Sequence, residues 1–194
     1  MNELDVKEKL LQSACKEFIH YGFKKASIRN IAAGAGVTIG ALYYFFKNKE
    51  ALFLALTESP AKQFDLLFEK WVEDELKEPS SAASGEHAMM EFFINNKDAF
   101  ILLTEKAEGT VYEGYTESCM AKFIDISRNF FCKYIKAPDD DLIRLVAYVR
   151  FKGIAQIVMS DIEDEKKFKL SEQFGLYSEA GFAKLIQMNV GEII

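Results

Sequence analysis

The chain has 194 residues, a formal net charge of −6 and an apolar fraction of 49%, a composition that favours one or two globular domains and excludes an intrinsically disordered chain. No apolar run approaches the roughly 20 residues that cross a bilayer, and the charged start of the chain lacks a signal-peptide core, so we expect a cytoplasmic protein without a membrane partner. The 3 cysteines are scattered and the 2 histidines lie far apart, which disfavours a disulfide framework or a metal site, and no cofactor is expected.

Charge is distributed unevenly along the chain. Residues 1–50 carry 8 basic and 5 acidic side chains, for a net charge of +3, whereas the remainder carries a net charge of −9. A basic head on an acidic body orients a protein on a polyanion. The asymmetry is modest, and it is consistent with nucleic-acid binding without establishing it.

The first predicted helix spans residues 4–21. Gly22 is expected to end it, because glycine readily adopts the backbone conformation found just after a helix. The apolar residues that recur every fourth position form one buried stripe, namely Val6, Leu10, Ala14 and Phe18.

Residues 27–50, SIRNIAAGAGVTIGALYYFFKNKE, are predicted to form two short helices joined by a tight turn. Ser27 and Thr38 can each cap a helix through the side-chain oxygen. Gly36 stands where the first helix should stop, and glycine takes the left-handed conformation that a sharp turn needs. The internal apolar positions have the spacing of a helix-turn-helix: Ile28, Ile31, Ala35, Val37, Leu42 and Phe45, with the small Ala32 where the helices cross.

Two interpretations of this segment are open on spacing alone. A helix-turn-helix reads DNA by presenting the N-terminal residues of its second helix to base edges in the major groove. An ordinary hairpin of two helices would show the same apolar inner face. The glycine at the turn and the spacing favour the DNA-binding interpretation.

The run VTIGALYYFFKNKEALF, residues 37–53, resembles the signature of the TetR family of bacterial repressors. That signature combines a valine, a capping serine or threonine, a glycine two residues later, an aromatic pair and Phe-Lys-x-Lys-Glu before an apolar helix. The preceding pattern AxxxFxxxGFxxxSIxxIAxxAGV, residues 14–37, is similar to the first two helices of the same family. The resemblance implies an all-α fold, with a DNA-binding domain at residues 1–50 and an effector-binding and dimerisation domain at residues 51–194.

The resemblance also implies which residues contact an operator. Lys49 occupies the place of a lysine that commonly contacts phosphate, Tyr43 can reach a phosphate or a thymine methyl, and Tyr44 is expected to brace against the backbone. Where the family often has lysine and then serine or threonine, this chain has Ile39 and Ala41, which predict A/T-containing half-sites with few direct hydrogen bonds. The full set of expected DNA contacts is Ser27, Arg29, Thr38, Ile39, Gly40, Ala41, Tyr43, Tyr44 and Lys49.

A long helix is expected to follow from about residue 48, with an interruption at Pro60. Proline removes one helical hydrogen bond and costs about 3 kcal/mol unless the helix bends or ends. We therefore expect either one kinked helix or two segments that meet near Ser59. The resemblance makes this helix the connection between head and body, so a kink can transmit a signal or can be only a packing bend.

The middle of the chain begins with a predicted serine-rich loop at residues 77–85. Short helices are expected at about 86–96 and 98–107. Thr110 is expected to cap a long helix that ends near residue 136. Its inner stripe, at the spacing of a centrally packed helix, is Tyr112, Tyr115, Cys119, Phe123, Ile126 and Phe130.

Two final helices are expected at about residues 139–160 and 165–189, the first with Asp139 to Asp141 at its positive end. The resemblance implies that they pair with a second copy to form a homodimer, since reading two half-sites requires two heads. The alternative is that they only close the core of one chain. The expected interface residues are Val146, Val149, Gly153, Ile157, Phe174, Tyr177 and Phe182.

A small-molecule effector is expected in the body, as the resemblance implies. Aromatic residues at helical spacing can line a pocket, although such stripes are more often core. Glu105, Glu108 and Glu117 can add negative charge, which would suit a lipophilic cation. The expected ligand-binding residues are Phe64, Phe68, Trp71, Phe93, Phe100, Glu105, Tyr112, Tyr115, Phe123 and Phe151.

We therefore predict a transcriptional repressor that binds a palindromic double-stranded DNA operator and is released from it by an effector. Activation of transcription instead of repression is left open. A protein-interaction module is one alternative, and salt separates the two because phosphate contacts weaken steeply with salt. A helical enzyme is the other. It would need a phosphate loop, an HExxH motif or a triad, and none is recognisable, so no catalytic residue is expected.

Overall fold

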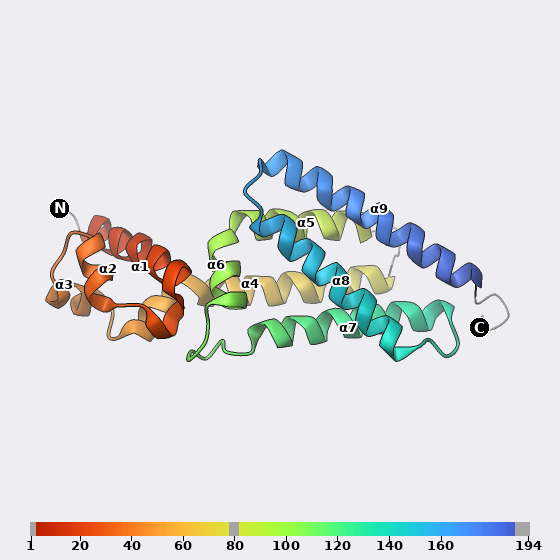
Figure 1. Cartoon of the computed structure of the whole chain (residues 1–194), viewed down its shortest axis with the longest axis horizontal. Helices are drawn as coiled ribbons and strands as arrows, with labels where there is room; N and C mark the ends of the chain where they lie inside the picture. The colour runs from red at the N-terminus through yellow and green to blue at the C-terminus, as the bar shows by residue number, and fades with distance from the viewer. Residues whose placement is uncertain (1–2, 78–81, 189–194) are drawn as a thin grey trace. The chain divides into compact units, whose positions relative to one another are not determined.

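The structure, a computed structural model, describes residues 3–77 and 82–188, and within these ranges it contains helices and no strand (Figure 1). The all-α prediction is therefore confirmed. None of the described helices is long and apolar enough to span a bilayer. In chain order the helices are α1 (Glu3–Lys25), α2 (Ile28–Gly34), α3 (Ile39–Phe45), α4 (Lys49–Lys77), α5 (Ala82–Asn95), α6 (Lys97–Glu105), α7 (Tyr115–Tyr134), α8 (Asp140–Met159) and α9 (Asp164–Met188).

The chain divides into two compact units. The first unit comprises Met1–Leu66 and Asn96–Thr116, and the second comprises Leu67–Asn95 and Glu117–Ile194. Helix α6 therefore belongs to the same unit as α1, α2 and α3, although more than 50 residues separate it from α3 in sequence. The expected functional boundary at residue 50 is a different division of the chain, and it stays a prediction.

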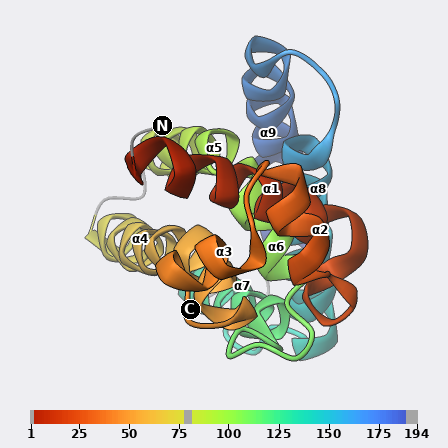
Figure 2. The same cartoon turned by 90° about the vertical axis from the view of Figure 1, so that its left-hand side faces the viewer.

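The core of the first unit is built on the apolar stripe of α1. Leu10 and Phe18 are fully buried, together with Leu42 of α3 and Phe53 of α4. The rings of Phe18 and Phe53 meet edge to face with centroids 5.3 Å apart. Leu102 of α6 completes this core. Figure 2 shows α1, α2 and α3 of this unit from the side. Of the stripe predicted for the first helix, Leu10, Ala14 and Phe18 are buried, and Val6 packs against this core while partly exposed.

Gly22 was predicted to end the first helix, and Pro60 was predicted to bend or interrupt the fourth. Gly22 leaves the helical conformation with φ 74° and ψ 159°, at the expected place, after which the chain makes one more short turn to Lys25. Pro60 lies inside α4, which continues through it to Lys77 as a single helix. Of the two alternatives left open, one kinked helix or two segments that meet near Ser59, the structure has a single helix. Asn48 caps α4, its Oδ1 accepting a hydrogen bond of 2.8 Å from the amide of Ala51.

The second unit packs α5, α7, α8 and α9 against one another, with α9 lying along α5 and α8 (Figure 1). Phe131, Ile135 and Ile143 form the buried centre of the α7–α8 end. Phe182 of α9 covers this centre, its ring centroid 4.8 Å from that of Phe131. The inner stripe predicted for this helix ended at Phe130, but the structure buries the next residue, Phe131, and leaves Phe130 half-buried.

Three predictions about the middle of the chain are wrong. Thr110 does not cap a helix, because its hydroxyl accepts a bond of 3.1 Å from the amide of Tyr112 within a turn, and α7 begins only at Tyr115. Gly109 and Gly114, with φ of 82° and 87°, make this turn, so Tyr112 is not part of the helical stripe. The expected loop at residues 77–85 is also too long, since α5 begins at Ala82. Its residues 78–81 lie outside the described ranges.

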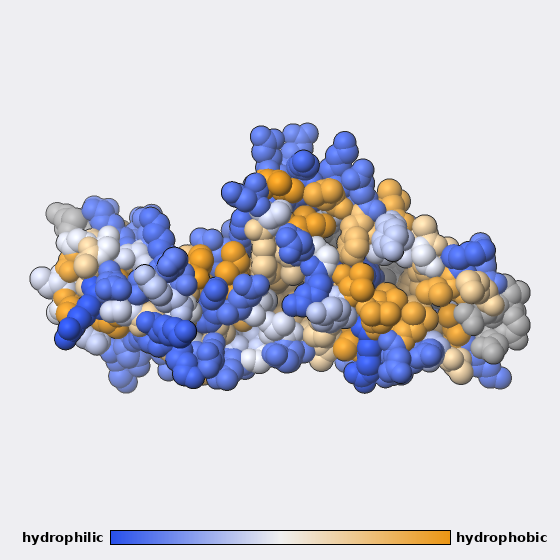
Figure 3. All heavy atoms as spheres, viewed as in Figure 1, coloured by the Kyte–Doolittle hydropathy of each residue, from blue (hydrophilic) through white to orange (hydrophobic). Residues whose placement is uncertain are grey.

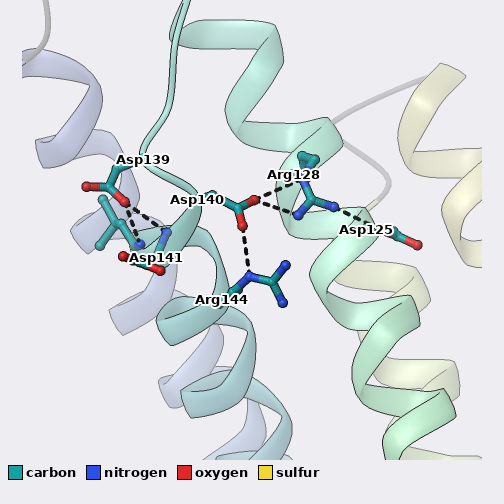
Figure 4. A network of polar contacts seen from close by, with 7 residues as sticks. Asp125, Arg128, Asp139, Asp140, Asp141 and Arg144 are labelled. Carbon is teal, nitrogen blue, oxygen red and sulfur yellow. Dashed lines mark hydrogen bonds and ion pairs between the residues drawn. The ribbon is translucent and has the colours of Figure 1, made fainter.

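The start of α8 agrees with its prediction. The carboxylate of Asp139 accepts hydrogen bonds from the amides of Asp141 and Leu142, at 2.8 and 3.3 Å. Beside this cap, Asp140 links α8 to α7: its carboxylate lies 2.6 Å from Nη2 of Arg128 and 2.8 Å from Nε of Arg144 (Figure 4). These hydrogen bonds to two guanidinium groups hold the pKa of Asp140 below its usual range.

Candidate nucleic-acid interface and ligand pocket

Helices α2 and α3 form the predicted pair with a tight turn between them. The hydroxyl oxygen of Ser27 accepts a bond of 3.4 Å from the amide of Asn30, and that of Thr38 accepts one of 3.1 Å from the amide of Ala41. Gly36 has φ 69°, a conformation that costs other residues about 1–2 kcal/mol. Both predicted caps and the predicted turn glycine are confirmed.

The second helix of this pair turns one face inward and one outward. Leu42 is fully buried, whereas Ile39, Tyr43 and Tyr44 are 40%, 51% and 71% exposed. Thr38 and Gly40 are exposed as well, and Ala41 is half-buried. A large apolar or aromatic side chain left in solvent loses the free energy of burial. This outward face is therefore the part of α3 that is available to a partner such as a DNA groove.

The first helix of the pair is held by α1 through contacts that the sequence did not suggest. One carboxylate oxygen of Glu17 accepts hydrogen bonds from the amide of Ser27, at 3.0 Å, and from the side chain of Asn30, at 3.1 Å. The hydroxyl of Ser13 donates to the carbonyl of Ile31 at 2.8 Å. A side chain at Gly34 would collide with Ser13. Nothing in the sequence indicated that Ser13 and Glu17, two polar residues of α1, would contact α2.

Lys49, expected at phosphate, also has partners inside the first unit. Its Nζ donates to the carbonyls of Ala26 and Lys24, at 3.1 and 3.2 Å, and lies 4.7 Å above the ring of Phe23. Partial burial lowers the pKa of this ammonium from its usual value. Lys49 therefore fastens the α1–α2 connection to the start of α4, and contact with phosphate stays a prediction.

The other charged groups around this surface are mostly exposed. Arg29 and Lys47 lie in solvent on either side of α3 in sequence. Lys24 forms an ion pair of 2.7 Å with Glu108, which occupies the connection between α6 and α7. The bond to Lys24 holds the pKa of Glu108 below its usual value. Glu108 therefore belongs to the first unit and pairs there with Lys24, while its expected role near a ligand stays a prediction.

A pocket lies in the second unit, between α5, α7, α8 and α9. Its cavity measures about 30 Å³, which is room for a water molecule rather than a drug-sized ligand. Met89, Met90, Phe93, Phe123, Ile154 and Phe174 supply apolar walls, and Arg150, Ser171, Gly175 and Ser178 complete the lining.

The predicted ligand-binding residues divide between the two units. Phe93 and Phe123 line this pocket. Phe68 and Phe151 pack against Phe123, with ring centroids 5.5 and 5.3 Å from it. The structure does not place the others in this lining: Phe64, Phe100, Glu105, Tyr112 and Tyr115 belong to the first unit, and the side chain of Trp71 lies outside the described residues.

The predicted dimer residues also divide into two groups. A side chain at Gly153 would lie 2.5–2.7 Å from ring carbons of Phe174, so these two residues pack together within one chain. Val146 and Phe182 pack against the chain's own α7–α8 core, and Ile157 is half-buried. Val149 and Tyr177 remain exposed, at 45% and 72%.

The capped helix pair with an exposed second helix, in a chain whose described elements are all helices, defines a helix-turn-helix DNA-binding protein. The profile of bacterial regulatory proteins of the tetR family matches residues 10–56. The HTH-type transcriptional regulator YhgD of Bacillus subtilis, itself uncharacterised, is 27% identical over 142 residues, which cover 73% of this chain and 71% of YhgD. Residues 10–56 therefore form a DNA-binding domain similar to that of the TetR family, and the chain is a DNA-binding transcriptional regulator.

Two further comparisons agree with this assignment. The probable acrEF/envCD operon repressor of Escherichia coli K12 is 38% identical over 50 residues, which cover 26% of this chain and 23% of that repressor. The crystal structure of a transcriptional regulator from Aquifex aeolicus VF5 matches with a TM-score of 0.58 at 21% identity, over 89% of this chain and 99% of the other. The second comparison concerns the fold alone.

Proposed function

We propose that the protein is a repressor that binds a palindromic operator as a homodimer and leaves it when a small molecule binds its body. The observation that carries the DNA-binding part is the outward face of α3, where Ile39, Tyr43 and Tyr44 stand in solvent on a helix fixed at both ends. Thr38 caps its start at 3.1 Å, and Gly36 sets its direction. A reading helix needs this combination of exposure and fixed position.

The proposed contacts are those of the resemblance, adjusted to the observed exposure. Arg29 supplies a phosphate contact that positions the head, and we add Lys47 to the contacts of the resemblance because its side chain is exposed. Ile39 and Tyr43 supply the apolar contacts that read thymine methyl groups. Lys49 contributes mainly by holding the head together, because two of its three donors already bind carbonyls of the same unit.

An apolar surface on α8 and α9 supports the homodimer. Figure 3 shows apolar residues gathered along α8 and beside α9 on the face that it presents. Leu145, Tyr148 and Val149 of α8 are 45–59% exposed, and Leu176 and Tyr177 of α9 are 65% and 72% exposed. Exposed apolar side chains on neighbouring helices are typical of an interaction site. We propose these five residues as the centre of the interface, with Gly153 and Phe174 inside each protomer.

The small cavity of the second unit supports regulation by a ligand. Its volume of about 30 Å³ is room for a water molecule and not for a drug-sized ligand. A ligand that binds there selects or creates a more open arrangement of α5, α8 and α9. Such a ligand shifts the protein away from the arrangement that DNA selects, by no more than its difference in affinity for the two.

The decisive experiment is capture of genomic DNA fragments by the purified protein at low and moderate salt, followed by footprinting of the selected fragment. A protected palindrome over a promoter, weakened by salt and lost in an Arg29→Ala/Tyr43→Ala variant, is the expected result. Tyr21→Ala is the matched control, because Tyr21 is 50% exposed, like Tyr43, but lies on α1. Binding without sequence preference, or binding that salt leaves unchanged, would instead favour a protein-interaction module.

A further inference from the structure

Helix α3 makes one polar contact with the first turn of α1. The hydroxyl of Tyr44, on α3, donates a hydrogen bond of 3.2 Å to the carboxylate of Glu3, on α1. The two residues are 41 positions apart in sequence, and both side chains are exposed. The contact therefore places an acidic group of α1 beside the face of α3 that the proposed function turns toward DNA.

A tyrosine hydroxyl has a single hydrogen atom to donate. While Tyr44 donates this hydrogen to Glu3, the hydrogen is not available to a phosphate oxygen of DNA. The carboxylate also repels a phosphate that approaches the hydroxyl, since both groups carry negative charge. The hydrogen bond from Tyr44 to Glu3 and one from Tyr44 to phosphate therefore exclude each other.

Tyr44 lies where a phosphate contact is expected. It is the sixth of the 7 residues of α3 (Ile39–Phe45) and is 71% exposed. A reading helix presents its N-terminal residues to base edges, so a residue near its other end lies closer to the sugar-phosphate backbone at the side of the groove. Tyrosine is among the side chains that bond to phosphate oxygens. The hydroxyl of Tyr44 is therefore a donor for which Glu3 and DNA compete.

We propose that Glu3 is an intramolecular competitor of DNA phosphate, which holds the Tyr44 hydroxyl in the free protein and releases it when the head binds a duplex. Glu3 is then a positioning residue that lowers the affinity for DNA by acting through Tyr44. The inference rests on the proposed function, because it requires α3 to face DNA. Phosphate contacts carry no sequence information, so Glu3 weakens binding to every duplex and leaves the preference for the operator unchanged.

The neighbouring acids of α1 supply a comparison, because their carboxylates have other partners. Glu8 accepts a hydrogen bond of 3.4 Å from the side chain of Gln12, on α1 itself. Glu17 accepts from the amide of Ser27 at 3.0 Å. Replacing Glu8 therefore removes the same charge from the same helix as replacing Glu3, without freeing the hydroxyl on α3.

The test measures binding of the full chain to two labelled duplexes, one of random sequence and one that carries the footprinted operator, by fluorescence anisotropy. Glu3→Ala should strengthen binding to both duplexes more than Glu8→Ala does, by about two- to fivefold per head, the size expected of an exposed polar contact. Glu8→Ala is the matched control for the loss of one negative charge. Equal effects of the two variants would show that Glu3 acts through its charge alone and would overturn the proposal.

A double-variant cycle tests whether Glu3 acts through Tyr44. Tyr44→Phe removes the hydroxyl and keeps the ring, so it should weaken binding to both duplexes. In the Tyr44→Phe background, Glu3→Ala and Glu8→Ala should have equal effects, because no hydroxyl is left to release. An advantage of Glu3→Ala that persists in this background also overturns the proposal.

The contact itself is measured without DNA, so that the inference and the proposed function are tested separately. In protein with ¹³C-labelled tyrosine, the ζ-carbon resonance of Tyr44 should shift in Glu3→Ala and not in Glu8→Ala. A resonance that Glu3→Ala leaves unchanged overturns the inference alone.

The two duplexes complete the separation. Equal affinity for both duplexes, with the expected advantage of Glu3→Ala, supports the inference and contradicts a sequence-selective repressor. Preference for the operator without that advantage supports the proposed function and contradicts the inference. Binding of neither duplex by any variant contradicts both.

Discussion

The ammonium group of Lys49 lies 3.1 Å from the carbonyl oxygen of Ala26 and 3.2 Å from that of Lys24, so the first residue of α4 ties down the end of α1. Lys49→Met removes both hydrogen bonds and leaves two carbonyl groups to solvent. We expect it to lower the free energy of unfolding by about 1 kcal/mol, since each such bond contributes modestly at a partly exposed site. Denaturant unfolding measures the change.

The salt dependence of operator binding separates this fastening role from a phosphate contact. A lysine that neutralises one phosphate contributes about 0.9 to the slope of log K against log salt. Lys47→Met, at an exposed residue of the same connection, should reduce that slope by about this amount. Lys49→Met should weaken binding with little change in slope. A full unit lost in Lys49→Met would show that its third donor does reach phosphate.

Gly36 provides the second prediction. Its φ of 69° lies in the left-handed region, and no neighbouring atom lies within 4 Å of where a side chain would begin. Gly36→Ala should therefore cost about 1–2 kcal/mol through backbone strain alone. Gly40→Ala is the control, because Gly40 lies inside α3 and alanine there should stabilise the helix by about 0.5–1 kcal/mol. Equal effects of the two changes would contradict the assignment of strain to Gly36.

The helix pair could be predicted closely because its signals are local. Ser27, Gly36 and Thr38 act on atoms within four residues of themselves, and the apolar spacing follows from helix geometry. The pocket could not be predicted in this way. Arg150 and Phe93 come together only through the packing of α5 against α8 and α9, and aromatic spacing alone does not distinguish a pocket wall from core.

The errors in the middle of the chain have a similar explanation. Thr110 has the residue type of a cap, but Gly109 and Gly114 both adopt positive φ and delay the helix until Tyr115. The turn made by these two glycines, and not the threonine, therefore determines where the helix begins. Phe174, which the resemblance places in a dimer interface, packs on Gly153 of its own chain, and its contact with a second copy stays a prediction. Sequence spacing identifies an apolar face but not the partner that covers it.

Operator composition is the third prediction. Ile39 is 40% exposed on the outward face of α3 and can offer a base only apolar contact, for which the thymine methyl group is the natural partner. Selection from a random DNA library should therefore give half-sites with A/T pairs at the positions nearest the start of α3, where Ile39 lies. Ile39→Ala should relax this preference, at a cost of about 1 kcal/mol per half-site for the best sequence. Selected half-sites rich in G/C at these positions would contradict the prediction.

The fourth prediction concerns the apolar face of α8 and α9. Val149→Glu and Tyr177→Glu place charges on residues that are 45% and 72% exposed in one chain. A charge buried in an interface without a partner costs several kcal/mol, so each change should weaken the dimer at least a hundredfold in sedimentation equilibrium. Leu66→Glu is the control, because Leu66 is 67% exposed on α4. Dimers that tolerate both changes on α8 and α9 would place the interface elsewhere.

Acid stability tests the link between α7 and α8. Hydrogen bonds from Arg128 and Arg144 lower the pKa of Asp140, so its charged form is favoured by folding. The stability that it contributes is therefore present above the usual carboxyl pKa of about 4 and is lost as the pH falls through the lowered value. Asp140→Asn should lower Tm by about 1–3 °C at pH 7, a small effect because the pair is exposed to solvent. This difference in Tm from the unchanged protein should disappear as the pH falls below about 4.

Asp161→Asn, at an exposed residue after α8, is the control and should change Tm little at either pH. A difference for Asp140→Asn that stays constant down to acid pH would show that Asp140 acts through something other than its charge.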